Sequence, residues 1–248
     1  MSVLTHAMAL NSREHAGLRL LPQQGFAYAR EIHMAGVMQP EFLRVAALYP
    51  IVFVEDPAFD TFRPMALFGL RAGENLFVGS DGRWQGAYVP AVVRAYPFAL
   101  GRDAKDDRIA VCVDAVATTR DAGVGEPLFQ ADGQPAPALL HAKAFLSRLR
   151  QMQVVTDAFC RALAERNLFT PLAVRVRRGD EVVQVGGCYV VNEDRLEGLS
   201  LESLAGLRPR GWLAAAFAHL VSLMQIERLE AGPLHPGPDR PAVDGVRR

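Results

Sequence analysis

Residues 75–98 read NLFVGSDGRWQGAYVPAVVRAYPF, a segment rich in aromatic residues and interrupted by glycine and proline. Residues 75–78 predict a strand, and the Asp81-Gly82 pair that follows is a hairpin signal because glycine adopts the left-handed conformation of the turn. Residues 84–89 predict the return strand. Pro90 should end it, because proline has no N–H to donate to a sheet ladder.

The same segment places one cation near several rings. Arg94 lies close in sequence to Trp84, Tyr88 and Tyr96. Arginine binds carboxylates through paired hydrogen bonds, and aromatic rings stack on peptide or aromatic groups. We therefore predict a ligand- or partner-binding surface at these residues, to which Asn75 adds hydrogen bonds with a peptide backbone. The alternative is structural, with Arg94 covering a ring at a sheet edge and Asn75 capping a turn.

Outward from this segment, the sequence predicts more strands than helices in its first half. Apolar runs predict strands at residues 26–33, 51–55, 63–70 and 109–114, and those at 51–55 and 109–114 should be buried. A proline-led helix is predicted at residues 40–49, with apolar positions 42, 45, 46 and 49 facing the core.

The second half predicts a long helix, a hairpin and a final helix. Apolar residues recur at steps of three and four over residues 138–167, while residues 172–177 and 181–191 predict two strands joined at 179–180. The last helix is predicted at 210–230. The fold class is therefore α+β, with a mostly antiparallel sheet packed by the long helix and completed by a C-terminal hairpin and final helix. We expect a single domain over residues 1–230, with a subdivision near 135 as the alternative, and a disordered tail over 231–248.

Composition excludes some classes of function. The sequence has 27 basic and 27 acidic residues, so its net charge is zero, which argues against a general nucleic-acid-binding protein. No apolar run is long enough to span a membrane, and the N-terminus lacks the pattern of a secretory signal. These features predict a cytoplasmic protein without a membrane span. They do not predict its oligomeric state.

No pattern of catalytic, metal-binding or cofactor-binding residues stands out. The six histidines lack metal-ligand spacing, and no glycine motif for a nucleotide is present. His15, beside Glu14, is the nearest candidate for a general base, although a lone histidine in a loop is usually solvated. The three cysteines fit buried reduced thiols. We therefore predict no catalytic residue, metal or cofactor and lean against an enzyme.

An ordered set of short segments resembles the bacterial SapC family. These segments are YPIVF at 49–53, GL at 69–70, ENLFV at 74–78, DGRW at 81–84, YVPA at 88–91, Arg94, YPF at 96–98, LF at 128–129, DGQ at 132–134, Thr156 and SL at 222–223. The resemblance covers nearly the whole chain up to about residue 230. One position departs from it, since Ala95 stands where a second arginine is expected.

The family takes its name from a gene associated with surface-layer protein and export genes, and its relatives often lie near TonB-dependent receptors, flavin-dependent halogenase-like proteins and cupin-type oxygenases. The resemblance thus implies a surface-layer or outer-membrane uptake context. The first functional hypothesis is a non-catalytic binding or accessory protein that recognises a peptide or protein partner. The alternatives are a peptide-modifying enzyme or accessory subunit that acts with an oxygenase or halogenase, and a surface-layer or export component.

Overall fold

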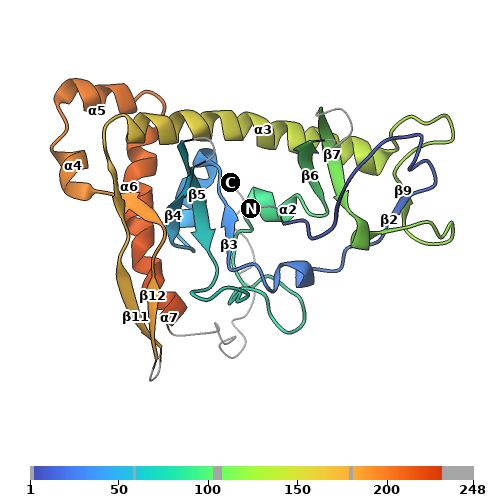
Figure 1. Ribbon diagram of the computed structural model, residues 1–248, viewed down its shortest axis with the longest axis horizontal. Coiled ribbons are helices and arrows are strands. Elements are labelled where there is room, and N and C mark those ends of the chain that lie inside the picture. The colour runs from blue at the N-terminus through green and yellow to red at the C-terminus, as the bar shows by residue number, and fades with distance from the viewer. Residues whose placement is uncertain (1–2, 58–59, 103–107, 179–180, 231–248) are drawn as a thin grey trace, which may run out of the picture.

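The computed structural model describes the chain except residues 1–2, 58–59, 103–107, 179–180 and 231–248. Two main sheets lie along one long helix, α3 (Pro137–Ala164), which spans both of them (Figure 1). The sheets are antiparallel, and further helices pack beside them, so the predicted α+β class is confirmed.

The larger sheet has five strands in the order β10–β13–β4–β5–β3, and its neighbouring strands pair antiparallel. Its strands are β3 (Met34–Gly36), β4 (Ile51–Asp56), β5 (Thr61–Leu67), β10 (Phe169–Pro171) and β13 (Tyr189–Val191). The apolar runs predicted at 51–55 and 63–70 form the two central strands β4 and β5. Both are buried over much of their length, as continuous β-branched and aromatic runs favour.

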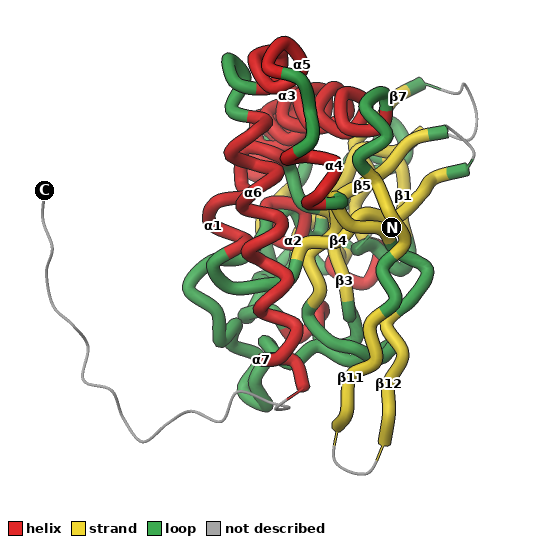
Figure 2. The backbone as a smooth tube through the Cα atoms, turned by 90° about the vertical axis from the view of Figure 1, so that its left-hand side faces the viewer, coloured by secondary structure: helices red, strands yellow, loops and turns green. Residues whose placement is uncertain are grey.

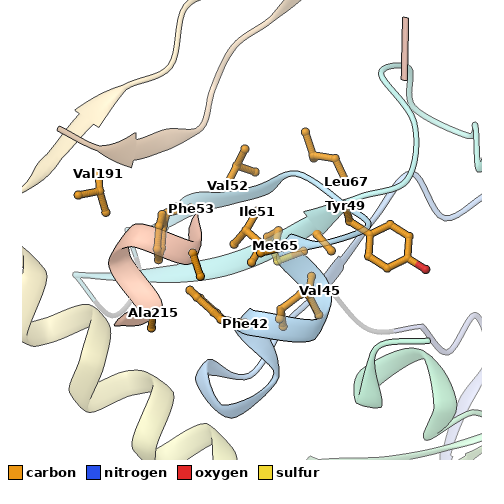
Figure 3. Close-up of a cluster of buried hydrophobic side chains, with 14 of the residues drawn as sticks. Phe42, Val45, Tyr49, Ile51, Val52, Phe53, Met65, Leu67, Val191 and Ala215 are labelled. Carbon is orange, nitrogen blue, oxygen red and sulfur yellow. The ribbon is translucent and has the colours of Figure 1, made fainter. Parts of the chain in front are cut away.

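Helices cover one face of this sheet (Figure 2). The predicted helix at 40–49 consists of the 3-10 helix η2 (Gln39–Glu41) and α1 (Phe42–Ala46), and it packs beside α6 (Trp212–Ser222). Side chains of α1, β4 and α6 meet in the first hydrophobic core (Figure 3). Each large apolar side chain that is fully buried there contributes about 2 kcal/mol to stability.

A second core lies at the other end of the molecule. It is bounded by a three-stranded sheet of order β1–β7–β6, made of β1 (Ala7–Ala9), β7 (Ile109–Asp114) and β6 (Phe98–Arg102). A small sheet of order β8–β2–β9 lies beside it, made of β2 (Arg19–Leu20), β8 (Thr118–Thr119) and β9 (Glu126–Pro127). The strand predicted at 109–114 is β7.

Helix α3 belongs to both cores. Leu139 and Leu146 in its first half are buried in the second core, whereas Phe159 and Leu163 in its second half are buried in the first. With 28 residues at about 1.5 Å each, the helix is about 42 Å long, which is enough to reach across both sheets. The predicted helix at 138–167 is therefore confirmed and ends at residue 164.

The C-terminal part follows the prediction with two refinements. Strands β11 (Val174–Arg178) and β12 (Glu181–Val185) form a hairpin that extends away from the body, and the turn predicted at 179–180 lies outside the described residues (Figure 2). Gly187, with φ +75°, separates β12 from β13, so the strand predicted at 181–191 is divided. Besides α6, the C-terminal part contains the helices α4 (Glu193–Glu197), α5 (Leu201–Leu207), η4 (Leu223–Gln225) and α7 (Ile226–Glu230).

The strand predicted at residues 26–33 is wrong. This segment forms a 3-10 helix, η1 (Ala27–Ala29), because its backbone groups bond locally and to another loop rather than to a strand. The Phe26 N–H donates to the Gly82 carbonyl at 2.7 Å, and the Ala29 carbonyl accepts from the Asn75 amide at 2.8 Å. The predicted subdivision near 135 stays a prediction, and the predicted tail lies outside the described residues.

None of the described helices combines the length and the apolar character that crossing a bilayer requires.

Candidate functional site

The hairpin predicted for residues 75–98 is only partly formed. Its turn is present, with Gly82 at φ +77°, but the strands are reduced to one antiparallel bridge between Val78 and Trp84. Two residues after the bridge, the backbone of Gly86 packs closely against the Tyr49 hydroxyl. A Cβ at this glycine would lie 2.2 Å from that oxygen, so no larger residue fits without a shift of the chain. After Pro90, the segment forms the short helix α2 (Ala91–Arg94).

Asn75 is buried and holds two backbone segments together. Its amide nitrogen donates to the Ala29 carbonyl at 2.8 Å, and its oxygen accepts from the Phe77 N–H at 2.9 Å. Both polar atoms of the side chain are therefore used within the fold. The position agrees with the structural alternative for Asn75, in which it fixes a turn.

Trp84 starts a hydrogen-bond relay that ends beneath Tyr88. The indole Nε1 donates to the Tyr49 hydroxyl at 2.8 Å, and that hydroxyl donates to the Tyr88 carbonyl at 2.5 Å. Burial raises the pKa of Tyr49 to about 12, so its hydroxyl keeps its proton at neutral pH. The relay fixes the backbone of Tyr88 from the interior side.

The Tyr88 side chain is fixed by a buried carboxylate, Glu41. One Glu41 oxygen accepts from the Tyr88 hydroxyl at 2.5 Å and from the Ala91 N–H at 2.9 Å. Its other oxygen accepts from the Met38 N–H at 3.2 Å. Burial and the neighbouring Glu41 together raise the pKa of Tyr88. Three donors thus satisfy a carboxylate that is 3% exposed, and Tyr88 is one of them.

Two exposed arginines lie over the Tyr88 ring. The guanidinium carbon of Arg94 is 5.6 Å from the ring centroid of Tyr88 and 5.6 Å from that of Phe145, on α3. The corresponding atom of Arg44, on α1, is 5.8 Å from the Tyr88 ring. Arg94 also donates through Nε to the Val89 carbonyl at 2.9 Å, which directs its head group. We call Arg44, Tyr88, Arg94 and Phe145 the arginine–tyrosine patch.

Within the described residues, neither arginine of the patch forms an ion pair. Arg94 donates one strong hydrogen bond to the Val89 carbonyl and a longer one, of 3.4 Å, to the Tyr88 hydroxyl. A guanidinium carries five N–H donors, so most of those on Arg94 and Arg44 remain open to solvent. The surface around the Tyr88 ring therefore carries two positive charges that no acid pairs within the described residues.

Tyr96 lies outside the patch. Its ring stacks on Tyr28 with centroids 3.8 Å apart, and the Tyr28 hydroxyl donates to the Val93 carbonyl at 2.9 Å. Ala95, where the resemblance leads one to expect a second arginine, is buried in the second core. A cation at that position would not reach the patch, and Arg44 supplies the second positive charge there.

The structure therefore brings together only two of the five predicted site residues, Tyr88 and Arg94. Sequence reasoning missed Glu41, Arg44 and Phe145, which come from other elements. One signal was available, since the predicted helix at 40–49 places residue 44 opposite its apolar face. Nothing in the sequence indicated that this helix packs against Tyr88.

The other candidate groups have structural surroundings. His15 is buried, and its Nδ1 accepts from the Asn11 N–H at 3.1 Å, so it does not lie in a solvated loop. Burial raises the pKa of Cys160 and that of Cys188, which keeps both thiols protonated. In the part of the chain that the structure describes, no three His, Cys, Asp or Glu side chains are placed to share a metal ion.

Comparison with known proteins identifies one family. The family model described as SapC matches residues 10–229, which is most of the chain, and the chain therefore belongs to the SapC family. No curated protein matches it, and no solved structure does.

Proposed function

We propose that this SapC-family chain is a non-catalytic binding or accessory protein that recognises a peptide or protein partner through the arginine–tyrosine patch. The observation that supports the proposal is the pair of exposed guanidinium groups, Arg44 and Arg94, over one anchored ring. Such a pair suits a partner that presents a carboxylate beside an apolar or aromatic group.

The ring that both arginines contact is held in advance of binding. Tyr88 is fixed through its hydroxyl by Glu41 and through its carbonyl by Tyr49. A surface that is ordered before the partner arrives loses little conformational entropy on binding, and this favours recognition by a small number of contacts. The half-buried Phe145 extends the apolar part of the patch beyond Tyr88.

A library of displayed linear peptides, selected on the purified full chain, tests the proposal. Peptides that bind the patch should contain Asp or Glu near an apolar residue. Their affinity should fall about tenfold or more in the Arg44→Ala/Arg94→Ala double variant, because each charge-assisted contact contributes more than 1 kcal/mol.

Arg83→Ala is the matched control. Arg83 belongs to the same segment of the chain and is highly exposed, and its Nε lies 3.6 Å from a carboxylate oxygen of Asp81. It lies outside the patch and should leave peptide affinity unchanged. Selection of no peptide whose binding depends on Arg44 and Arg94 would overturn the proposal, as would equal affinity for the double variant and the wild type.

A further inference from the structure

A cleft of about 730 Å³ lies between the two main sheets, on the side of α2 away from Arg94. One wall is β6, and the other is formed by the end of β3 and by β5. Helix α3 extends over both sheets (Figure 1). Its side chains between Leu146 and Arg161 contribute to the lining of the cleft. Val92 and Ala95 belong to its lining, so the cleft shares α2 with the patch but not its residues.

Strand β6 turns its backbone edge toward the cleft. Phe98, Ala99 and Leu100 are consecutive, and all three line it. Successive side chains of a strand point to opposite faces, so three consecutive lining residues indicate contact along the edge. Strand β6 is also the outer strand of its sheet, with β7 as its one partner there.

The register identifies which groups are free on that edge. The Asp114 N–H donates to the Pro97 carbonyl at 2.9 Å, and in an antiparallel ladder such bonded pairs alternate with unbonded ones. Ala99 is therefore bonded to β7, whereas the N–H and C=O of Leu100 point away from it. Among the described residues, neither group of Leu100 has a hydrogen-bond partner.

The opposite wall repeats this arrangement. The Val37 N–H donates to the Pro64 carbonyl at 3.0 Å, so the N–H and C=O of Gly36, one residue earlier, face away from β5. Gly36 also lines the cleft, and β3 is the outer strand of the five-stranded sheet. Two sheets thus present open edges to one cavity, and an open edge is a template for a further strand.

The side chains around the cleft indicate what kind of strand fits. Its lining is about as polar as it is apolar, and the chain's own Val3 and Leu4 are among the apolar residues. Arg150 and Arg161 of α3 line it as well and form no ion pair within the described residues. Asp157 is the acid in the lining, and it accepts a hydrogen bond from Gln153 at 2.6 Å.

We propose that this cleft binds an extended peptide segment by strand addition to β6. The segment pairs with the free N–H and C=O of Leu100, buries small apolar side chains in the cleft, and directs an Asp or Glu toward Arg150. The site goes beyond the proposed function because none of its residues belongs to the arginine–tyrosine patch. Failure of the Arg44/Arg94 experiment would leave it untouched.

The decisive comparison is Leu100→Pro against Leu100→Ala. Both variants lose the leucine side chain, but only proline lacks the N–H, and that N–H makes no bond with β7. Peptides from the displayed library whose binding weakens in Arg150→Gln are the probes. Their affinity should be about fivefold or more lower for Leu100→Pro than for Leu100→Ala, since one backbone hydrogen bond contributes about 1 kcal/mol.

A second measurement tests the proposal even when circular dichroism shows that Leu100→Pro does not fold. Hydrogen exchange of the Leu100 amide in the wild type should slow when the peptide is bound, and N-methylation of alternate peptide residues should weaken binding. Equal affinity of the two Leu100 variants with no slowing of exchange would overturn the proposal. So would a long-chain fatty acid that displaces the peptide and leaves Leu100 exchange unchanged, because it would assign the cleft to amphipathic anions.

Discussion

The two halves of residues 75–98 are used in different ways. The first half turns inward, so that Asn75 and Trp84 hydrogen-bond to the fold. In the second half, Tyr88 and Arg94 contribute to an exposed patch, while the neighbouring residues Ala91, Val93 and Phe98 are buried. The comparison teaches that residue types which suggest recognition are also those that a fold uses to fix an irregular loop. Substitution of the inward-facing Asn75 should change stability, whereas substitution of the exposed Arg94 should change binding.

Asn75→Ala should have the largest effect. It leaves the Ala29 carbonyl and the Phe77 N–H without their partner in a buried position, and we expect the free energy of unfolding to fall by about 3 kcal/mol. Chemical denaturation measures the change. Gln85→Ala, at an exposed position of the same segment, is the control and should stay within about 0.5 kcal/mol of the wild type. Equal stability of the two variants would show that the buried hydrogen bonds of Asn75 do not stabilise the fold.

Alkaline pH should have the second-largest effect, a loss of folding stability through Tyr49, the hydrogen-bond partner of Trp84. The pKa of Tyr49 is about 12 in the folded chain, against about 10 for an unperturbed tyrosine. The unfolded chain therefore loses this proton first, and stability that is fully present below pH ~10 should fall as the pH rises toward 12, by about 2 kcal/mol. Denaturation at several pH values tests this. A Tyr49→Phe variant with an equally steep pH dependence would show that other groups cause the loss.

Tyr88→Phe lies at the boundary between the halves and should have an intermediate effect. The substitution keeps the ring beneath the arginines but removes one of three donors to Glu41, so we expect a loss of about 1 kcal/mol in stability. Affinity for patch-binding peptides should weaken less than in Arg94→Ala, because both guanidinium groups remain. A larger loss of affinity in Tyr88→Phe would place the recognition at the hydroxyl instead of at the arginines.

Arg94→Ala should change stability least, by no more than about 0.5 kcal/mol, since exposed cations contribute little to folding. Its effect belongs to binding, where we expect about a fivefold loss of affinity for patch-binding peptides. Isothermal calorimetry on folded protein separates the two quantities. A stability loss comparable to that of Asn75→Ala would mean that Arg94 has a structural role, as Asn75 does, and not a role in binding.

The parts of the fold that follow from continuous runs were predictable. Strands β4, β5 and β7 and helix α3 are long apolar or periodic segments, and burial alone defines them. Residues 26–33 misled the prediction because their alternating pattern resembles a strand. The outcome there depends on Gly82 and Asn75, more than 40 residues away, which take the backbone groups that a neighbouring strand would need.

The residues of the candidate site also divide into those that the local sequence brings together and those that distant elements supply. Tyr88 and Arg94 are six residues apart, and their proximity follows from the sequence. Glu41 and Arg44 reach them from a helix about 50 residues earlier, and Phe145 reaches them from one about 50 residues later. Which helix packs against a loop is decided by the whole assembly. The two open strand edges around the cleft could not be predicted from the sequence either, because β6 is a short strand that the sequence did not predict.

The relay from Trp84 to Tyr88 gives the protein an internal optical probe. The sequence has two tryptophans, Trp84 and Trp212, and the second is buried beneath Arg210 at 4.8 Å. In a Trp212→Phe chain, intrinsic fluorescence would come from Trp84 alone. Its indole is bonded to the hydroxyl that holds the Tyr88 backbone, so a ligand that shifts Tyr88 changes the polarity around a single fluorophore. Occupancy of the arginine–tyrosine patch can then be followed by emission in real time, without an attached dye.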